Sequence, residues 1–589
     1  MDISQKLSTL RKEMVANKVD LYLVPTSDAH QSEYVGNFWK CRQWISGFRG
    51  SAGLAVIGHD FAHLWTDGRY FLQAKAELED SEFKLMKQNQ ELGINFNSWL
   101  KENILKFKSI GANGEQYTVS AANLIKKLCD ENSVNFNFSY DLISNIWSNR
   151  EALPNNDIFS FDIKYAGVSR AEKITNVRKN LKNESNYLLT ALDSIAWILN
   201  LRGSDISFNP VFYSYLLISN KEVILFINEN KLSNDLKNEL LNDGIKIYPY
   251  NEFYKFLENF ENNISLSLEN TNFNIYKKIT KSNFIKSTCP VVELKAIKNN
   301  IEINNLKEAL KADSIALINF FMWLENNLNK ITEYEASKKL SEFRSKNKNY
   351  LSDSFKAIIG YKENGAVIHY TPRERTAKTI ESNGVLLVDS GGQYLNGTTD
   401  ITRTISLGET TEEEKENYTL VLKGHIALAK AKFLEGTSGS ELDILARQFL
   451  FNENKNYKHG TGHGVGFCLN VHEGPQGIAP ARNSSKKVSL AKGMLMSNEP
   501  GFYKDNDYGI RIENLILVIK DISNSYGNFL KFETLTFFPI DLTLVNKKML
   551  LEQEVNWINE YHTKVYEHLC ASLDRKQNKW LKTKCKIIS

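Results

Sequence analysis

The stretch from Val385 to Leu407 reads VLLVDSGGQYLNGTTDITRTISL, and it decides how the second half of the chain folds. Two runs of apolar and β-branched residues flank Asn396-Gly397, a dipeptide that strongly favours the turn of a β-hairpin. The sequence therefore predicts two antiparallel strands. The first strand is Val385–Asp389, and Asp400 lies two residues before the second, Thr402–Leu407.

The register of this hairpin decides whether the two aspartates can act together. If the Asn-Gly dipeptide alone forms the turn, Asp400 pairs with Gln393, and Asp389 lies on the same face but four residues further along. That offset is about 13 Å at the rise of a strand, which is too far for a shared metal ion. We therefore expect a wider turn, or an interrupted ladder at Gly391-Gly392, because glycine pairs in strands commonly mark bulges.

A second predicted hairpin repeats this pattern nearer the C-terminus. Met494–Glu499 and Gly509–Val518 read as strands, separated by a short segment of turn-forming Asp and Asn residues. Glu499 ends the first strand, and Glu513 lies within the second. Alternation along the strand places Arg511 on the same face as Glu513, so the guanidinium is expected to hold that carboxylate in position.

Helices are predicted around the two hairpins. Apolar spacing indicates amphipathic helices at Leu420–Phe433 and Gly439–Phe451, between the hairpins, and a helix at Val292–Asn326 ahead of them. The segment Lys547–Trp580 is helical and aromatic enough to suggest an interface.

A segment rich in glycine and histidine lies between the hairpins and reads HGTGHGVG at 459–466. A histidine among alternating glycines suits neither a helix nor a buried strand, so we interpret His463 as a metal ligand. The glycines are no dinucleotide-binding fingerprint, because Val465 stands where that motif needs glycine. His369 and His472 would each be structural if read alone. Near a metal site they can donate hydrogen bonds to an oxyanion or a leaving group.

Five residues of these segments together predict a dinuclear metal site, which we call the cage. They are Asp389, Asp400, His463, Glu499 and Glu513. Four carboxylates and one imidazole suit two dications better than one tetrahedral zinc ion, and without cations the acids would repel one another. Two ions about 3.5–4 Å apart would lower the pKa of a shared water, so we expect a bridging hydroxide as the nucleophile. Neither a Gly-x-Ser-x-Gly elbow nor an HExxH helix is present.

Composition excludes several other classes of function. The 589 residues exceed one typical domain, and a net charge of +4 with a single basic tract, Arg575–Lys586, gives nucleic-acid binding little support. No apolar run approaches the roughly 18 residues of a membrane span, and the N-terminal segment lacks the core of a signal peptide. We therefore expect a cytoplasmic protein.

The six cysteines show no CxxC pairing, which favours reduced, structural thiols.

Two related phrases in the first half predict a duplicated α/β domain. WISGFRGSAG begins at Trp44 and WILNLRGSD begins at Trp197, and each lies between two strand-like runs. Turn-forming residues at Glu151–Asp157 indicate a linker, and Ser287–Pro290 marks a second break. We therefore expect three domains, at residues 1–155, 156–289 and 290–589.

Longer motifs resemble those of aminopeptidase P, the Xaa-Pro aminopeptidase, in its long three-domain cytosolic form. The resemblance covers nearly the whole chain and is carried by DSGGQYLNGTTDITRT at 389–404, HGTGHGVG at 459–466, VHEGP at 471–475, NEPG at 498–501, GIRIEN at 509–514, SDAHQSEY at 27–34 and TDGRY at 66–70. It implies an α/β fold of two creatinase-like N-terminal domains and a pita-bread catalytic domain, usually as a homodimer.

The same resemblance implies roles for the residues of the site. It implies two divalent ions, most often manganese, with one bound by Asp389, the other by His463 and Glu499, and both bridged by Asp400 and Glu513. Glu499 would also be the base toward the bridging water. The residues that match substrate-contacting positions are His369, His459 and His472.

The implied reaction removes the first residue of a short peptide whose second residue is proline. The tertiary nitrogen of that bond has no N–H, and most peptidases cannot seat it. Prolidase is the main alternative, because it shares the cage but demands a free carboxylate directly after proline; the length and the duplicated front half favour aminopeptidase P. Methionine aminopeptidase lacks the front domains, whereas creatinase and the metal-free pita-bread binding modules lack the cage, so these rank lower.

Overall fold

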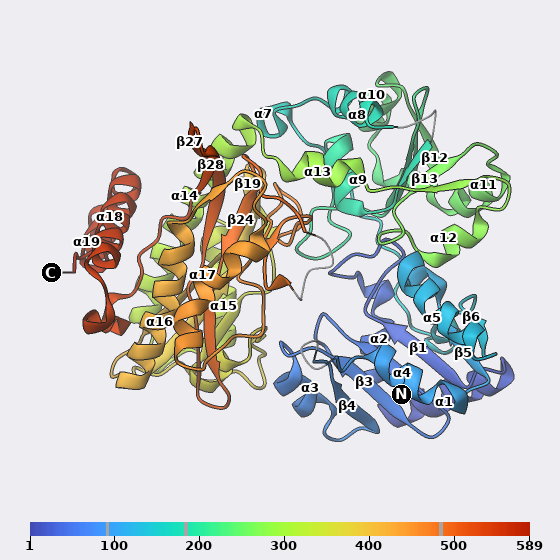
Figure 1. Cartoon of the computed structure of the whole chain (residues 1–589), viewed down its shortest axis with the longest axis horizontal. Coiled ribbons are helices and arrows are strands. Elements are labelled where there is room, and N and C mark those ends of the chain that lie inside the picture. The colour runs from blue at the N-terminus through green and yellow to red at the C-terminus, as the bar shows by residue number, and fades with distance from the viewer. Residues whose placement is uncertain (90–92, 182–185, 482–486, 589) are drawn as a thin grey trace. The chain divides into compact units, whose positions relative to one another are not determined.

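The computed structural model describes residues 1–89, 93–181, 186–481 and 487–588 (Figure 1). The chain folds into two compact units, Met1–Val292 and Glu293–Ser589.

The N-terminal unit begins with a six-stranded sheet. Its strands are β1 (Leu21–Pro25), β2 (Leu54–Ile57), β3 (Ala62–Thr66), β4 (Phe83–Lys87), β5 (Ser109–Ala112) and β6 (Asn135–Asn137). Their order is β4-β3-β2-β1-β5-β6. β2 is antiparallel to both β1 and β3, whereas the other neighbours are parallel.

A second six-stranded sheet in the same unit repeats this design. Its strands are β8 (Asn186–Leu189), β10 (Ser214–Ile218), β11 (Val223–Ile227), β12 (Ile245–Pro249), β13 (Ile264–Leu266) and β14 (Phe284–Lys286). The order β12-β11-β10-β8-β13-β14 and all strand directions match the first sheet position by position. Trp44 lies in α2 (Cys41–Ser46) and Trp197 in α9 (Leu192–Leu199), each between the first two strands of its sheet. The predicted duplication is confirmed.

Helices cover both faces of the first sheet. Tyr22 and Val24 pack with α1 (Ile3–Ala16), whereas Leu21 and Leu23 pack with α4 (Phe96–Asn103) and α5 (Val119–Glu131). Successive side chains of a strand point to opposite faces, so β1 is apolar throughout because it is buried on both sides. The remaining helices of this unit are α3 (Phe71–Leu78), α6 (Leu142–Ile146), α7 (Ile163–Ala166), α8 (Arg170–Lys179), α10 (Asn234–Asn242), α11 (Phe253–Asn259) and α12 (Phe273–Lys278).

The C-terminal unit is built from several small antiparallel sheets. β17 (Val385–Ser390) lies between β16 (Ile358–Tyr361) and β20 (Ile401–Ser406), and a further sheet has the order β21 (Lys432–Leu434), β28 (Gly527–Thr534), β27 (Asn514–Asn524), β24 (Leu495–Asn498). Shorter strands complete it: β15 (Tyr350–Asp353), β18 (Gly392–Tyr394), β19 (Gly397–Thr398), β22 (Gly462–His463), β23 (Gly477–Ile478), β25 (Gly501–Lys504) and β26 (Tyr508–Arg511).

Helices that precede the first hairpin or lie between the two hairpins pack against these sheets, and Figure 1 shows them around the strands of the C-terminal unit. They are α14 (Asn300–Glu325), α15 (Glu333–Arg344), α16 (Glu412–Ala429) and α17 (Gly439–Asn452). Ile318 of α14, Leu340 of α15 and Val421 of α16 share one apolar core with Val388 of β17. This apolar core between the helices and β17 therefore holds in place the strand that carries Asp389.

Two helix predictions differ from the structure at their boundaries. The helix predicted at Val292–Asn326 is broken into α13 (Pro290–Ala296) and α14, because Asn299 caps α14 and accepts hydrogen bonds from the backbone of Ile301 and Glu302. The helix predicted at Leu420–Phe433 starts at Glu412 with a capping box of its own and ends at Ala429, and β21 follows at Lys432–Leu434.

The C-terminal segment forms the predicted helices, α18 (Glu552–Leu569) and α19 (Arg575–Lys584). α19 begins with a capping box of Asp574 and Gln577, whereas at the start of α18 the Glu554 carboxylate accepts a hydrogen bond from the backbone N–H of Leu551 at 2.8 Å. Across the described ranges of the chain, we find no helix with the length and apolar character needed to cross a membrane.

Candidate metal centre and active site

The first hairpin places its two aspartates two residues apart along the ladder. β17 and β20 pair with Asp389 opposite Thr402, and Asp400 lies two residues before Thr402. Strand pairing stops at Gly391 and resumes in β18 and β19, so the predicted interruption at the glycines is present. A Cβ atom on Gly391 would lie 2.0 Å from the carbonyl oxygen of Thr399, which leaves room only for glycine.

The turn of this hairpin is shifted by one residue from the prediction. Tyr394 pairs with Gly397, so Leu395 and Asn396 form the turn instead of Asn396-Gly397. Gly397 has a φ of 150°, and a Cβ atom there would approach Leu306 of α14 to 3.0 Å. The absence of a side chain at Gly397 therefore allows this strand to lie close to α14. The shift reduces the offset between the aspartates from four residues to two, because the turn fixes the register.

Glu499 and Glu513 face each other across a second interrupted ladder. The pairing of β24 with β27 ends at Asn498 and Asn514, and β25 and β26 continue the same register beyond the two glutamates. Both pairs of acids therefore lie where a ladder breaks. An interrupted ladder bends its strands, which allows these side chains to converge.

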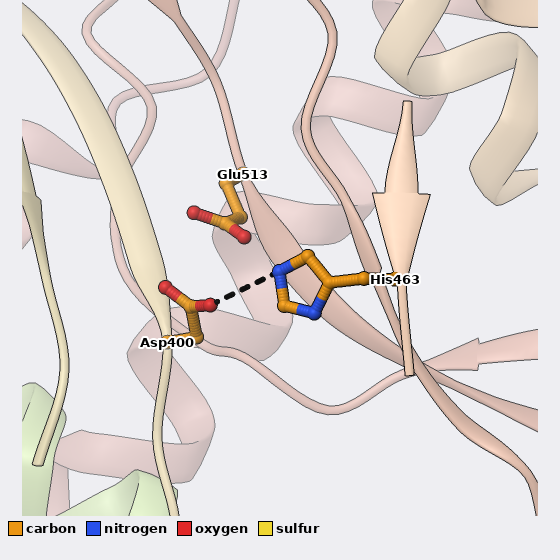
Figure 2. A group of neighbouring side chains, drawn as sticks. All are labelled: Asp400, His463 and Glu513. Carbon is orange, nitrogen blue, oxygen red and sulfur yellow. Dashed lines mark ion pairs between the residues drawn. The ribbon is translucent and has the colours of Figure 1, made fainter. Parts of the chain in front are cut away.

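His463 completes the cluster from β22. Its Nε2 atom lies 3.5 Å from Oδ2 of Asp400 and 3.5 Å from Oε1 of Glu499. One ligand atom each of Asp400, His463 and Glu513 lie within 4.8 Å of one another, and Figure 2 shows the three side chains converging. The Nδ1 atom contacts the Gly464 carbonyl oxygen at 2.9 Å, so the proton sits on Nδ1 in the neutral ring and the Nε2 lone pair faces the carboxylates.

The electrostatics of the cluster fit a site for divalent cations. Burial and the nearby charge of Asp400 raise the pKa of Glu513 well above its ordinary value, and burial also raises the pKa of Asp389 and of Glu499. Oδ1 of Asp389 is buried without a hydrogen-bond partner among the described residues. Cations would supply the missing partner and stabilise the ionised acids.

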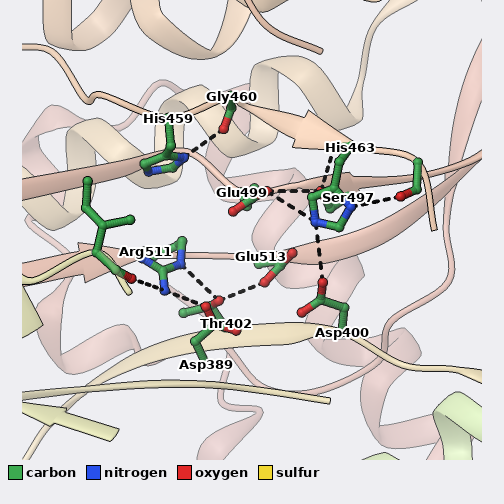
Figure 3. Close-up of polar contacts among 12 residues, drawn as sticks. Asp389, Asp400, Thr402, His459, Gly460, His463, Ser497, Glu499, Arg511 and Glu513 are labelled. Carbon is green, nitrogen blue, oxygen red and sulfur yellow. Dashed lines mark hydrogen bonds and ion pairs between the residues drawn. The ribbon is translucent and has the colours of Figure 1, made fainter. Parts of the chain in front are cut away.

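Arg511 contacts a different carboxylate from the predicted one. It donates from Nη2 to Oδ2 of Asp389, whereas Glu513 accepts a hydrogen bond of 2.7 Å from the hydroxyl of Thr402 (Figure 3). Thr402 lies opposite Asp389 on β20 and also meets Nε of Arg511 at 3.3 Å. The predicted pairing of Arg511 with Glu513 is therefore wrong, because β17 supplies Asp389 as the partner of Arg511 and β20 supplies Thr402 as the partner of Glu513.

Tyr503 links Arg511 to His459, and sequence reasoning missed it. Nδ1 of His459 lies 2.7 Å from the Gly460 carbonyl oxygen, so in the neutral ring Nδ1 donates and Nε2 accepts from the Tyr503 hydroxyl at 2.8 Å. The same hydroxyl accepts from Nη1 of Arg511 at 2.5 Å. Alternation on β25 and β26 places Tyr503 diagonally across from Arg511, and this was the available signal.

The other two predicted histidines reach the site in different ways. The ring of His472 meets the ring of His463 edge-on, with centroids 4.4 Å apart and planes at 84°. His369 follows Ile368, whose carbonyl oxygen accepts from Nη2 of Arg511 at 3.5 Å. The structure thus brings the ring of His472 against that of His463, and it places the backbone of Ile368, the residue before His369, beside Arg511.

Family comparisons agree with this geometry. Residues 304–520 match the model of metallopeptidase family M24, and residues 528–588 match the C-terminal region of peptidase M24. The creatinase/prolidase N-terminal domain is matched twice, at residues 6–140 and 149–302. The expected α/β fold, with creatinase-like N-terminal domains ahead of a pita-bread catalytic domain, is confirmed.

Similar proteins match along the entire chain. Xaa-Pro aminopeptidase 1 of Dictyostelium discoideum is 39% identical over 99% of this chain and 96% of its own length. A probable Xaa-Pro aminopeptidase P of Coprinopsis cinerea is 40% identical over 99% and 98%. The crystal structure of X-prolyl aminopeptidase from Caenorhabditis elegans, described as a cytosolic enzyme with a di-nuclear active site, superimposes with a TM-score of 0.95 at 35% identity over 100% of both chains. The chain belongs to the Xaa-Pro aminopeptidases of metallopeptidase family M24.

Proposed function

We propose that this protein hydrolyses the bond between the first residue of a peptide and a proline in second position, with two divalent cations in the cage. The observation that carries the proposal is the convergence of Asp400, His463 and Glu513, with ligand atoms within 4.8 Å of one another, in a chain whose full-length relatives are named Xaa-Pro aminopeptidases. Manganese suits a donor set of carboxylate oxygens and one imidazole.

Each ligand has a definite place in this proposal. Asp389 would hold one cation, His463 and Glu499 would hold the other, and Asp400 and Glu513 would be shared between them. The cations would supply Lewis acidity, which polarises the scissile carbonyl group and lowers the pKa of a water molecule. Glu499 is placed to accept a proton from that water, because its Oε1 lies 3.5 Å from Nε2 of His463 within the cluster and accepts from the Ser497 hydroxyl at 3.3 Å, which orients the carboxylate.

The histidines around the cage act on the peptide. The proline nitrogen carries no N–H, so it must receive a proton as the bond breaks, and the carbonyl oxygen gains negative charge. His369 and His472 are the proposed donors to these atoms, and His459 is proposed to contact the peptide. Arg511 orients Asp389, and Tyr503 keeps Nε2 of His459 hydrogen-bonded until substrate arrives.

We also propose three domains, at 1–155, 156–289 and 290–589, in a cytoplasmic homodimer. Each six-stranded sheet of the N-terminal unit falls within one of the first two ranges, and the last range begins near the boundary of the second compact unit, Glu293–Ser589. The dimer and the location rest on the resemblance to the three-domain cytosolic enzymes.

The main alternative is a prolidase, which cuts Xaa-Pro dipeptides. A prolidase from Pyrococcus horikoshii covers 63% of this chain with a TM-score of 0.50 at 24% identity, so it shares the fold of that part alone. Hydrolysis of an Xaa-Pro dipeptide should be compared with that of the matching Xaa-Pro-Xaa tripeptide by the manganese-loaded protein. Preference for the tripeptide supports the proposal, and cleavage of the dipeptide alone would make the chain a prolidase.

A further inference from the structure

A buried carboxylate next to His472 is held by two buried lysines. Oε2 of Glu473 lies 3.0 Å from Nζ of Lys295, and Oε1 lies 2.6 Å from Nζ of Lys298. The three side chains are only 1–2% exposed. We call this group the Glu473 triad. Burying three charges costs desolvation energy that their attraction offsets only in part, so such a group is weak evidence for added stability.

The lysines of the triad belong to the first residues of the C-terminal unit. Lys295 lies in α13 and Lys298 lies between α13 and α14. Nζ of Lys298 also donates to the Lys295 carbonyl oxygen at 2.8 Å, and its backbone N–H donates to the carbonyl oxygen of Gly493 at 2.9 Å. Gly493 lies two residues before β24, and Glu499 directly follows that strand. The lysines are therefore anchored to the strand that leads to a metal ligand.

The backbone of Glu473 contacts the other side of the cage. Its N–H donates to the Gly464 carbonyl oxygen at 2.8 Å, the same oxygen that lies 2.9 Å from Nδ1 of His463. A Cβ atom on Gly464 would lie 2.1 Å from the Glu473 carbonyl oxygen, so the two backbones touch. Glu473 thus helps to fix the acceptor that determines which nitrogen of His463 faces the carboxylates.

His472 lies between two anchored neighbours. Val471 on one side is buried, with 1% of its surface exposed, and Glu473 is held by the lysines on the other. The His472 ring then meets the His463 ring edge-on at 4.4 Å. The backbone that carries the imidazole is therefore held on both sides of His472.

We propose that Glu473, held by Lys295 and Lys298, is a positioning residue that keeps the His472 imidazole at the edge of the His463 ring. This rests on the proposed function, because it presumes that His472 acts on the peptide. Loss of the triad therefore reduces kcat through His472, whereas KM changes little.

A buried lysine–glutamate pair elsewhere in the unit provides a matched control. Nζ of Lys423 lies 2.6 Å from Oε2 of Glu554, and the side chains are 10% and 8% exposed. This pair joins α16 to α18. Glu554→Gln removes a comparable buried charge without touching the His472 segment.

A double-mutant cycle in the full-length, manganese-loaded protein tests the proposal. Glu473→Gln, His472→Ala and the double variant are assayed on an Xaa-Pro-Xaa tripeptide, and the Glu554→Gln cycle runs in parallel. We expect Glu473→Gln to lower kcat about 10- to 100-fold in the wild-type background and less than about twofold when His472 is already alanine. Glu554→Gln should have the same effect in both backgrounds. An equal loss from Glu473→Gln in both backgrounds, or none, would overturn the proposal.

A second measurement separates this inference from the proposed function. In metal-free protein labelled with ¹⁵N at histidine, Glu473→Gln should shift the ring signals of His472, whereas Glu554→Gln should not; unchanged signals would overturn the proposal. This result does not depend on peptide cleavage. A wild-type protein that cuts no Xaa-Pro-Xaa peptide would therefore contradict the proposed function but not the positioning of His472 by Glu473. If Glu473→Gln abolishes cooperative melting, Lys298→Met replaces it in both experiments with the same expected results.

Discussion

The guanidinium of Arg511 pairs with the carboxylate of Asp389 across neighbouring strands of the catalytic unit, and the side chain of Arg511 is 2% exposed. The same guanidinium donates to the Tyr503 hydroxyl at 2.5 Å, and that hydroxyl reaches Nε2 of His459 at 2.8 Å. The guanidinium of Arg511 therefore orients the proposed metal ligand Asp389 and, through Tyr503, the proposed substrate-contacting residue His459.

Arg511→Lys should lower kcat/KM by about 10- to 100-fold, because one ammonium group cannot make the divergent contacts of a guanidinium. Tyr503→Phe keeps the pair with Asp389 and should cost less. Steady-state kinetics on an Xaa-Pro-Xaa tripeptide measure both variants. Equal losses in the two would show that the pair with Asp389 adds nothing beyond the contact with Tyr503.

Asp400→Asn should abolish turnover and reduce the number of bound cations, while the fold stays intact. The side chain keeps its volume but loses the charge that faces His463 at 3.5 Å. Metal analysis and circular dichroism check the two parts of this statement. Full activity in the variant would contradict the bridging role.

Stability of the metal-free protein should fall as the pH rises from about 6.5 to about 9. Burial alone would lower the pKa of His463, but the hydrogen bond to Asp400 and the charge of Glu499 raise it from 6.5 to about 9. Because the folded state binds this proton more tightly, its contribution is complete below the unfolded pKa and is lost as the pH passes the folded one.

Thermal melting across this pH range, with and without manganese, measures the effect. The loaded protein should show a smaller decline, because the cations replace the proton. Metal-free His463→Asn serves as the control and should also decline less. Identical declines in wild type and His463→Asn would contradict the assignment.

Tyr561→Phe should reduce the free energy of unfolding by about 1–3 kcal/mol. The Tyr561 hydroxyl accepts from Nη2 of Arg403 at 2.9 Å, and Nη1 of that arginine donates to the Glu513 carbonyl oxygen at 2.6 Å. Helix α18 thus braces the strand region that carries a ligand. Urea titration measures the change, and Tyr526→Phe, at a side chain 84% exposed, should stay within about 0.5 kcal/mol. Equal effects of the two substitutions on the free energy of unfolding would show that the hydrogen bond between Tyr561 and Arg403 does not stabilise this region.

Local patterns in the sequence predicted the strands and the acids they carry, but not the contacts between segments. The Asn-Gly signal located the hairpin within one residue, and packing of Gly397 against Leu306 then determined which residues turn. Alternation placed Arg511 and Glu513 on one face, yet Thr402 from another strand became the partner of Glu513. Partners such as Lys298 and Glu473, 175 residues apart, follow from tertiary packing that no local pattern encodes.

The most direct test of the account is to count manganese ions bound to metal-stripped, full-length protein while following hydrolysis of a peptide that begins Arg-Pro-Pro. We predict two ions per chain, no cleavage without them, and release of the N-terminal arginine once they are bound. A chain that binds no manganese, or one that cleaves the peptide equally well after the metal has been removed, would contradict the account.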